Sequence, residues 1–215
     1  ELDRKGINEF IRRQLKEYMN HNGTILDAAA EVGNEAIFLL KNGFDVLINE
    51  YEPNFAEMLK KNIIEDSVLQ ERGITIEQMR KRIFQRDWRE LHKDIPPGSV
   101  KAILVLGNSL CMVSENGENQ RRLCIKQFFN ALCPGGVLII DERNFPKIDK
   151  TFREFGTIHG RSVMYPGKEV ECVLRPMDDH SRILFEFSKS GKPIGDLSVA
   201  YLERDELFRI LDEVG

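Results

Sequence analysis

The sequence predicts an α/β fold, with a mostly parallel, seven-stranded sheet, helices on both faces and an antiparallel C-terminal extension. Short apolar runs typical of buried strands alternate with helical patterns as far as residue 141. From about residue 157 apolar and polar residues alternate between turn signals, which favours antiparallel strands. The length of 215 residues suits a single domain, with a core over about 20–150 and the extension over about 157–215.

In the core, helical and strand patterns follow one another in regular order. Residues 7–19 carry apolar side chains at helical spacing between charges, which predicts an amphipathic helix before the first strand. Apolar runs predict strands over residues 24–28, 44–49, 83–85, 100–106 and 137–141. Helices are expected over residues 35–42, 53–63, most of 66–82 and 119–131. Pro53 suits a helix start, where its missing N–H costs nothing, and Asn42-Gly43 suits a helix end.

The predicted extension consists of short alternating segments. Pro166-Gly167 and Ser190-Gly191 are turn signals between them. The segments cover residues 162–165, 170–175, 182–188 and 197–202. A last helix is expected to begin near Arg204.

Charge and composition exclude several classes of function. A net charge of -4 offers no basic face for nucleic acid, and the basic cluster 80–82 suits a solvated helix face. No apolar run reaches the ~18 residues that span a bilayer, so no membrane segment is expected. The four cysteines lack zinc-binding spacing, so we predict no metal and expect reduced thiols in a cytoplasmic setting.

Three strand ends in the predicted parallel core carry side chains suited to a nucleoside. Asp27 ends the first strand before a loop of small residues, which lets a ligand approach the backbone and the following helix N-terminus. Glu50 ends the second strand, where an acid can accept both hydroxyls of a ribose. Asp87 follows the third strand and can accept an adenine amine. Each signal alone is more often structural, but three in sheet order favour a binding crevice.

Three further stretches carry a resemblance to a family. They are residues 105–109 (VLGNS), 132–136 (LCPGG) and 141–145 (DERNF). With them, the chain resembles the class I S-adenosylmethionine-dependent methyltransferases, specifically glycine N-methyltransferase and the glycine/sarcosine methyltransferases, from about 24 to 145 and more loosely to the end. The resemblance implies a Rossmann-like class I methyltransferase fold. It also implies methyl transfer from S-adenosylmethionine to a small amine, glycine or an N-methylated glycine.

The resemblance implies where the methionine end of the cofactor binds. Asp27, Ala29 and Gly33 would line it. Leu106 would offer its backbone carbonyl to the ammonium group of the cofactor.

By the same resemblance, four other residues would bind the nucleoside end of the cofactor. Glu50 would bind the ribose and Tyr51 would flank the adenine. Asp87 and Trp88 would contact the adenine and its ribose side.

By the same resemblance, Asn108 and Arg143 would face the methyl acceptor. A guanidinium can grip a carboxylate through two parallel hydrogen bonds, so Arg143 can orient an amino acid; the alternative for Arg143 is a surface salt bridge. Tyr201 is a candidate acceptor-site residue or a packed strand tyrosine. Direct in-line transfer to a neutral amine needs no nucleophile or metal, and no histidine is assigned to catalysis.

One residue departs from the family pattern. Glu31 stands where the family loop usually has glycine, which would bring a carboxylate near the carboxylate of the cofactor. Glu31 points outward, or weakens or alters the cofactor site, or marks an inactive methyltransferase-fold protein that serves as a binding partner. An NAD-dependent dehydrogenase would require the G-x-G-x-x-G spacing, which this chain lacks.

Overall fold

The computed structural model describes residues 4–19, 22–113, 117–161, 170–177 and 182–215. Its centre is a sheet of five parallel strands in the order β3-β2-β1-β4-β5. The strands are β1 (Thr24–Asp27), β2 (Asp45–Asn49), β3 (Ile83–Phe84), β4 (Val100–Val105) and β5 (Leu132–Ile140). The predicted α/β class with a parallel core is confirmed.

The strand order reverses beside β1. Ile25 of β1 pairs with Val46 of β2 on one side, and Leu26 of β1 pairs with Ile103 of β4 on the other. In open parallel sheets, the crevice at such a reversal is where ligands bind, outside the carboxyl ends of the strands. The topology therefore directs the search for a site to the loops that follow β1 and β4.

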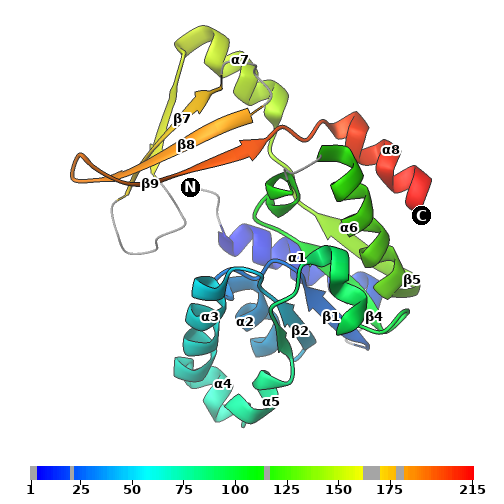
Figure 1. Ribbon diagram of the computed structural model, residues 1–215. Helices are drawn as coiled ribbons and strands as arrows, with labels where there is room; N and C mark the ends of the chain where they lie inside the picture. Colours follow the sequence, from blue (N-terminus) through cyan, green and yellow to red (C-terminus); the bar gives the residue numbers. More distant parts are fainter. Residues whose placement is uncertain (1–3, 20–21, 114–116, 162–169, 178–181) are drawn as a thin grey trace.

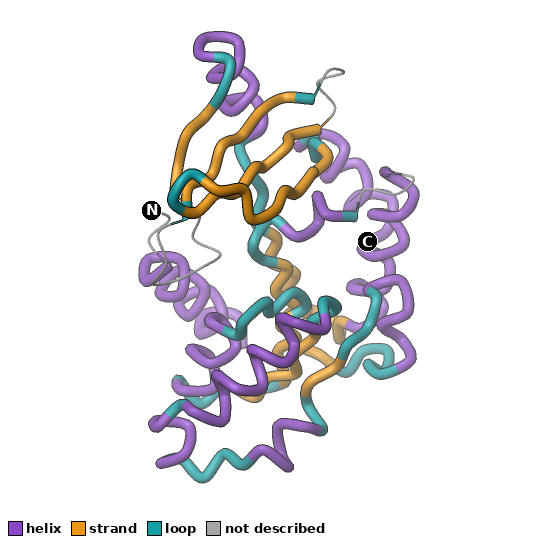
Figure 2. Tube along the Cα trace, turned by 60° about the vertical axis from the view of Figure 1, so that its left-hand side comes forward, coloured by secondary structure: helices purple, strands orange, loops and turns teal. Residues whose placement is uncertain are grey.

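Helices cover both faces of this sheet (Figures 1 and 2). One face packs against α1 (Arg4–Met19), α2 (Asn34–Lys41), α3 (Pro53–Glu65), α4 (Ser67–Glu71) and α5 (Ile76–Arg80). The other face packs against the 3-10 helix η1 (Trp88–Lys93), α6 (Gly117–Ala131) and α8 (Arg204–Val214). In the part of the chain that the structure describes, no helix is long and apolar enough to cross a membrane.

Burial on both faces explains the uninterrupted apolar runs. Successive side chains of β4 point to opposite faces, so Leu104 joins the core beneath α1 and α2, whereas Ile103 joins the core beneath α6. Both side chains are fully buried. A strand covered on one face would show apolar–polar alternation instead.

The C-terminal part forms a second sheet. Its four antiparallel strands are β6 (Ile158–Arg161), β7 (Glu171–Pro176), β8 (Arg182–Lys189) and β9 (Lys192–Ala200), in sequence order. Figure 2 shows this sheet as a separate layer from the parallel strands. Phe185 and Val199 point into the core that also contains α6 and α8.

Two sequence predictions about the sheets need correction. The seven-stranded sheet is wrong in its count, because the described strands divide into a five-stranded parallel sheet and a separate four-stranded one. Alternation identifies a strand but not its pairing partner, which tertiary packing decides. The predicted strand 162–165 lies outside the described residues, and the strand found beside it is β6. β5 begins at Leu132, earlier than predicted, and includes Pro134. Proline is tolerated there because β5 is an edge strand.

A helix that the sequence analysis did not predict, α7 (Phe145–Phe155), connects the two sheets. Its signals are present in the sequence. The side chain of Asn144 caps its start by accepting a hydrogen bond from the Lys147 N–H at 3.1 Å. Phe145 and Phe152 are buried on one stripe.

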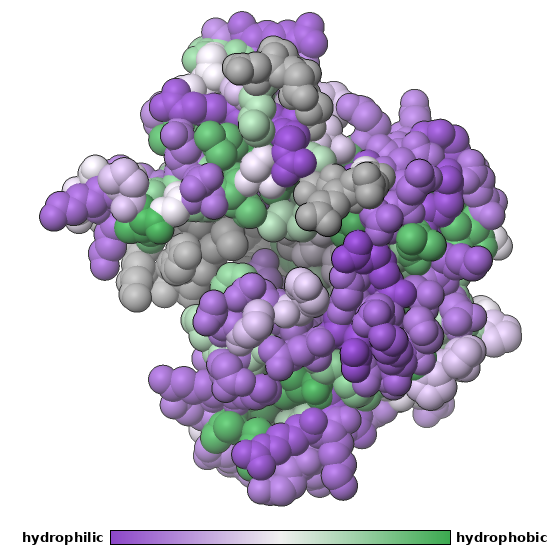
Figure 3. Space-filling view, viewed as in Figure 1, coloured by the Kyte–Doolittle hydropathy of each residue, from purple (hydrophilic) through white to green (hydrophobic). Residues whose placement is uncertain are grey.

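On the face shown in Figure 3, hydrophilic side chains dominate and apolar ones appear as small separate areas. Scattered apolar side chains of this kind are normal on a protein surface. The principal apolar burial is therefore in the two cores on either side of the parallel sheet.

A buried ion pair joins the last helix to the core. Arg121 of α6 is 4% exposed, and its Nε donates to the Glu206 carboxylate of α8 at 2.7 Å. Arg121 also donates to the carbonyl oxygen of Val113 at 3.2 Å. With its partner removed, the buried guanidinium would lack a countercharge.

We predict that Glu206→Ala lowers the free energy of unfolding by about 3 kcal/mol, because it leaves a buried cation without its partner. Arg209→Ala is the matched control, since Arg209 pairs with Glu118 between the same two helices but is 54% exposed. Arg209→Ala should lower the free energy of unfolding by less than about 1 kcal/mol. Urea unfolding measures both, and equal losses would contradict the distinction.

Candidate functional site

A cavity of about 1170 Å³ lies at the carboxyl ends of the parallel strands. The loops after β1, β2, β4 and β5 line it together with parts of α1, η1, α7 and β9. Leu197 and Val199 reach it from the antiparallel sheet, which therefore covers the strand ends. The cavity is where the strand reversal predicts a ligand site.

The loop after β1 is held to both neighbouring strands. The Ala28 N–H donates to the carbonyl oxygen of Leu104 at 2.9 Å, and the Ala30 N–H donates to that of Asn49 at 3.2 Å. Gly33 closes the loop at φ 90°, where an added Cβ would come within 2.3 Å of the Leu59 side chain. Glycine is therefore required at 33 both for backbone conformation and for packing against α3.

Glu31 occupies the left-handed region of backbone conformation, with φ 48°. This region favours glycine, which explains physically why the family pattern has glycine here. The half-buried Glu31 side chain lines the cavity. Of the three accounts of Glu31, the outward-pointing one is therefore wrong for this structure.

Glu50 lies at the end of β2 with 7% exposure. Its two carboxylate oxygens accept the backbone N–H of Glu31 at 2.6 Å and that of Glu52 at 2.8 Å. Burial raises the pKa of Glu50, and the two N–H donors partly offset that rise. Each carboxylate oxygen has a second lone pair, so Glu50 can still accept hydroxyl groups from a ligand in the cavity.

Asp27 lies behind the cavity wall and is 1% exposed. Burial raises its pKa well above the ordinary value, and the negative charges of Glu35, Glu50 and Glu31 raise it further. Among the described residues, its Oδ2 has no hydrogen-bond partner.

Trp88, the first residue of η1, is fixed at the cavity edge. Its indole N–H donates to the carbonyl oxygen of Ala28 at 2.7 Å, and its ring meets Phe128 edge to face at 5.3 Å. Asp87 caps η1 and pairs with Arg89, and the hydrogen bond from Arg89 lowers the pKa of Asp87. Tyr51, 66% exposed, lines the cavity nearby.

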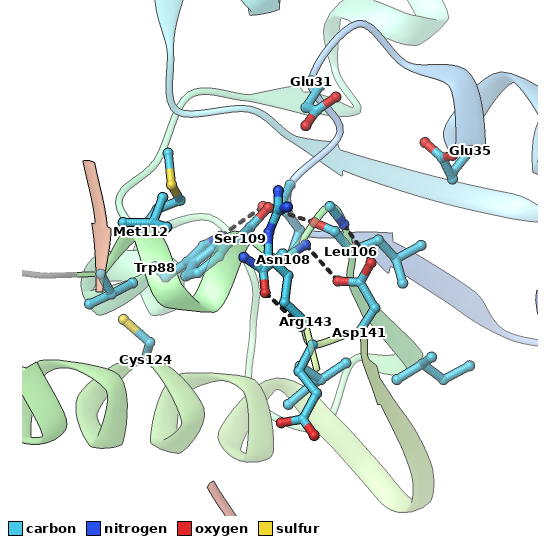
Figure 4. Close-up of a pocket in the computed structure, with 18 of the residues that line it drawn as sticks. Glu31, Glu35, Trp88, Leu106, Asn108, Ser109, Met112, Cys124, Asp141 and Arg143 are labelled. Carbon is cyan, nitrogen blue, oxygen red and sulfur yellow. Dashed lines mark hydrogen bonds between the residues drawn. The ribbon is translucent and has the colours of Figure 1, made fainter. Parts of the chain in front are cut away.

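The loops after β4 and β5 are joined by hydrogen bonds (Figure 4). The Asp141 carboxylate accepts the N–H of Gly107 at 3.1 Å and that of Asn108 at 2.6 Å. The Asn108 side-chain oxygen accepts the Arg143 N–H at 3.0 Å. Asn108 and Arg143 are therefore held side by side, while the Leu106 carbonyl accepts the Ser109 hydroxyl at 2.5 Å.

The guanidinium of Arg143 lies over the ring of Phe185, 4.7 Å from its centroid. Its Nε is buried and has no hydrogen-bond partner within the part of the chain that the structure describes. A half-buried cation stacked on a ring and lining a cavity is unlike a surface salt bridge. This geometry leaves donors for an anionic group.

Tyr201 follows β9 and packs edge to face against Phe145 at 4.9 Å. It is not among the residues that line the cavity. Its hydroxyl is buried without a hydrogen-bond partner in the described ranges, and burial raises its pKa. A role at the acceptor site stays a prediction for this residue.

The structure brings most of the predicted site residues to one cavity, and their individual roles remain predictions. Asp27, the last residue of β1, and Gly33, in the loop that follows it, do not line the cavity. Those that line it are Ala29, Glu50, Tyr51, Asp87, Trp88, Leu106, Asn108 and Arg143.

The sequence analysis missed several residues of the cavity. Asp141 could have been found, because it follows the fifth strand as Glu50 follows the second. Phe10 of α1 and Val199 of β9 carry no such signal, because only tertiary packing brings their elements over the strand ends.

Comparisons with known proteins place the chain among methyltransferases. It is 35% identical over 212 residues to the glycine/sarcosine N-methyltransferase of Halorhodospira halochloris, covering 98% of this chain and 71% of that protein. It is 30% identical over 209 residues to the protein of the same name in Aphanothece halophytica, covering 96% and 70%. Against the glycine N-methyltransferase of Rattus norvegicus it is 28% identical over 130 residues, covering 59% and 42%. No family model matches the chain.

Solved structures share the fold. An S-adenosylmethionine-dependent methyltransferase from Clostridium acetobutylicum aligns with a TM-score of 0.71 at 15% identity, covering 100% of this chain and 81% of that one. The amino pentose methyltransferase CalS10 from Micromonospora echinaspora, solved with S-adenosylmethionine bound, aligns with a TM-score of 0.70 at 14% identity, covering 98% and 82%. At these identities the likeness concerns the fold alone.

The raised pKa of Asp27 predicts a pH-dependent stability. The folded protein holds this proton to a higher pH than the unfolded chain, so the stability that protonation contributes is lost as pH rises above the ordinary value of 3.8. Asp27→Asn stays neutral. Its free energy of unfolding, relative to wild type, should therefore increase from about pH 4 to about pH 7. Urea unfolding at several pH values measures this, and parallel curves would contradict it.

Proposed function

The chain belongs to the glycine/sarcosine N-methyltransferase family, and from this premise we propose that it transfers a methyl group from S-adenosylmethionine to glycine or an N-methylated glycine. The observation that carries the proposal is the cavity at the strand reversal, where Glu50 and Arg143 line the same space. Glu50 suits the hydroxyl groups of a ribose, and Arg143 suits a carboxylate.

The residues around the loop after β1 fit S-adenosylmethionine. Glu50 holds two backbone N–H groups and retains lone pairs for the ribose hydroxyls. Ala29 leaves the backbone accessible, and Trp88 and Tyr51 offer aromatic surface to the adenine. When bound, S-adenosylmethionine supplies a methyl group that its sulfonium already makes electrophilic.

Arg143 and Asn108 are the proposed acceptor-binding residues. The stacked guanidinium of Arg143 can donate two hydrogen bonds to the carboxylate of an amino acid and so orient its amine. Asn108 positions the Arg143 backbone through the hydrogen bond at 3.0 Å. The remaining task of the chain is to align the reactants and keep water out, which Leu197 and Val199 assist from β9.

A second candidate function is a methyltransferase-fold protein that binds a ligand but has little or no turnover. It is favoured by the Glu31 carboxylate, which lines the cavity at the position where the family has glycine. It predicts cofactor binding without methyl transfer. For either function we propose a cytoplasmic setting, because all four cysteines are free thiols and three of them are buried.

Calorimetric titration with S-adenosylmethionine tests the first step. We expect saturable binding, followed by formation of S-adenosylhomocysteine when glycine, sarcosine or dimethylglycine is added. Binding without turnover on any amine of a broader amino-acid screen would favour the second candidate. The absence of binding would refute both.

We predict that Arg143→Ala raises the KM for the amine acceptor at least about ten-fold, because it removes charge-assisted hydrogen bonds to the carboxylate. The KM for S-adenosylmethionine should change little. Arg153→Ala is the control, since this arginine of α7 is 77% exposed and lies outside the cavity. Steady-state kinetics with each substrate varied in turn separate the two constants, and equal increases would contradict the proposed role.

A further inference from the structure

Glu31 lies at the strand reversal itself. It follows β1, and an ideal Cβ built on Gly107, in the loop after β4, would lie 3.1 Å from Glu31 Oε1. The carboxylate therefore reaches from one loop of the crevice to the other. Figure 4 shows Glu31 and Glu35 projecting from the adjoining loop and helix.

The cavity that contains Glu31 is strongly acidic. Three cationic side chains line it, Arg89, Arg143 and Lys147, and Arg89 is already paired with Asp87. Seven carboxylates line the same cavity: Glu31, Glu35, Glu50, Glu52, Asp87, Asp141 and Glu142. A half-enclosed space with this excess of negative charge favours a cation over a neutral molecule of the same shape.

The charges act on one another as well as on a ligand. Besides burial, the charges of Glu35, Glu50 and Glu31 raise the pKa of Asp27 behind the wall. The negative potential at this end of the crevice therefore already affects the pKa of Asp27.

The proposed reaction involves two molecules that such a potential distinguishes. S-adenosylmethionine carries a positive charge on its sulfonium, and S-adenosylhomocysteine, the by-product, has an uncharged thioether in its place. The two share every other group, including the ammonium and the carboxylate. Repulsion between Glu31 and the carboxylate is therefore common to both and cancels when their affinities are compared.

We propose that Glu31 is a specificity-determining residue that makes the cavity prefer the sulfonium methyl donor over its by-product, which lacks the charge on sulfur. This inference rests on the proposed function. It assigns a function to the glutamate that stands in place of glycine. By-product that binds weakly dissociates sooner and competes less with the methyl donor for the cavity. The cost is a left-handed backbone conformation that a glycine would adopt without strain.

Two variants separate charge from backbone strain. Glu31→Gln removes the charge and keeps the strained backbone with a side chain of similar size. Glu31→Gly removes both the charge and the strain, so it should also unfold at higher urea concentration than wild type. Glu57→Gln is the matched control, because this glutamate of α3 is 74% exposed and lies outside the cavity.

Calorimetry at low ionic strength gives the dissociation constants of S-adenosylmethionine and S-adenosylhomocysteine for all four proteins. We expect the preference for the cation to fall about ten-fold in both Glu31 variants, the order of effect that one charge lining the same cavity has at an effective dielectric constant of about 20. In Glu57→Gln it should stay within about two-fold of wild type, since an exposed charge outside the cavity acts through water of high dielectric constant.

Each other outcome overturns the inference. If both ligands bind and Glu31→Gln keeps the wild-type preference, the charge of Glu31 does not discriminate. If only Glu31→Gly loses it, backbone or side-chain size is responsible instead. If Glu57→Gln changes the preference as much, the effect is one of net charge. If neither ligand binds wild type, the proposed function fails as well, which distinguishes that failure from the others.

Discussion

The site depends on buried carboxylates that accept backbone N–H groups at the carboxyl ends of the parallel strands. Asp141 holds two N–H groups of the loop after β4, and Glu50 holds one from the loop after β1 and one before α3. Beyond the strands these N–H groups lose their ladder partners and need other acceptors. Charged acceptors make stronger hydrogen bonds than neutral ones, so each loop is held in one conformation.

This way of holding the loops concentrates negative charge. Burial raises the pKa of Asp27, Glu50 and Asp141. In the proposed function, the negative charge of these carboxylates favours a cationic ligand, so the groups that shape the crevice also select the charge of the ligand. Glu31 adds to the same field while its own N–H is held by Glu50. The architecture of the loops and the proposed preference for a sulfonium donor thus have one physical origin.

The proposed acceptor side of the cavity depends on the contact between the two sheets. Arg143 belongs to the loop after β5, and the ring beneath its guanidinium belongs to Phe185 of β8. Phe145 meets Tyr201 across the same junction. An antiparallel sheet that joined the parallel one edge to edge would have left the strand ends open; packed over them, it covers the cavity and orients Arg143.

The sequence by itself determined the parallel core and the strand ends that line the cavity, because these depend on local periodicity and on the rule that parallel strands end at one edge. Glu50 could be singled out in this way, whereas Arg143 was named only through the resemblance to a family. Only the tertiary structure decided that the C-terminal strands form their own sheet, that Val199 and Phe10 cover the cavity, and that the Glu31 carboxylate lies against Gly107. These features depend on contacts between segments far apart in the chain, and no local pattern encodes them.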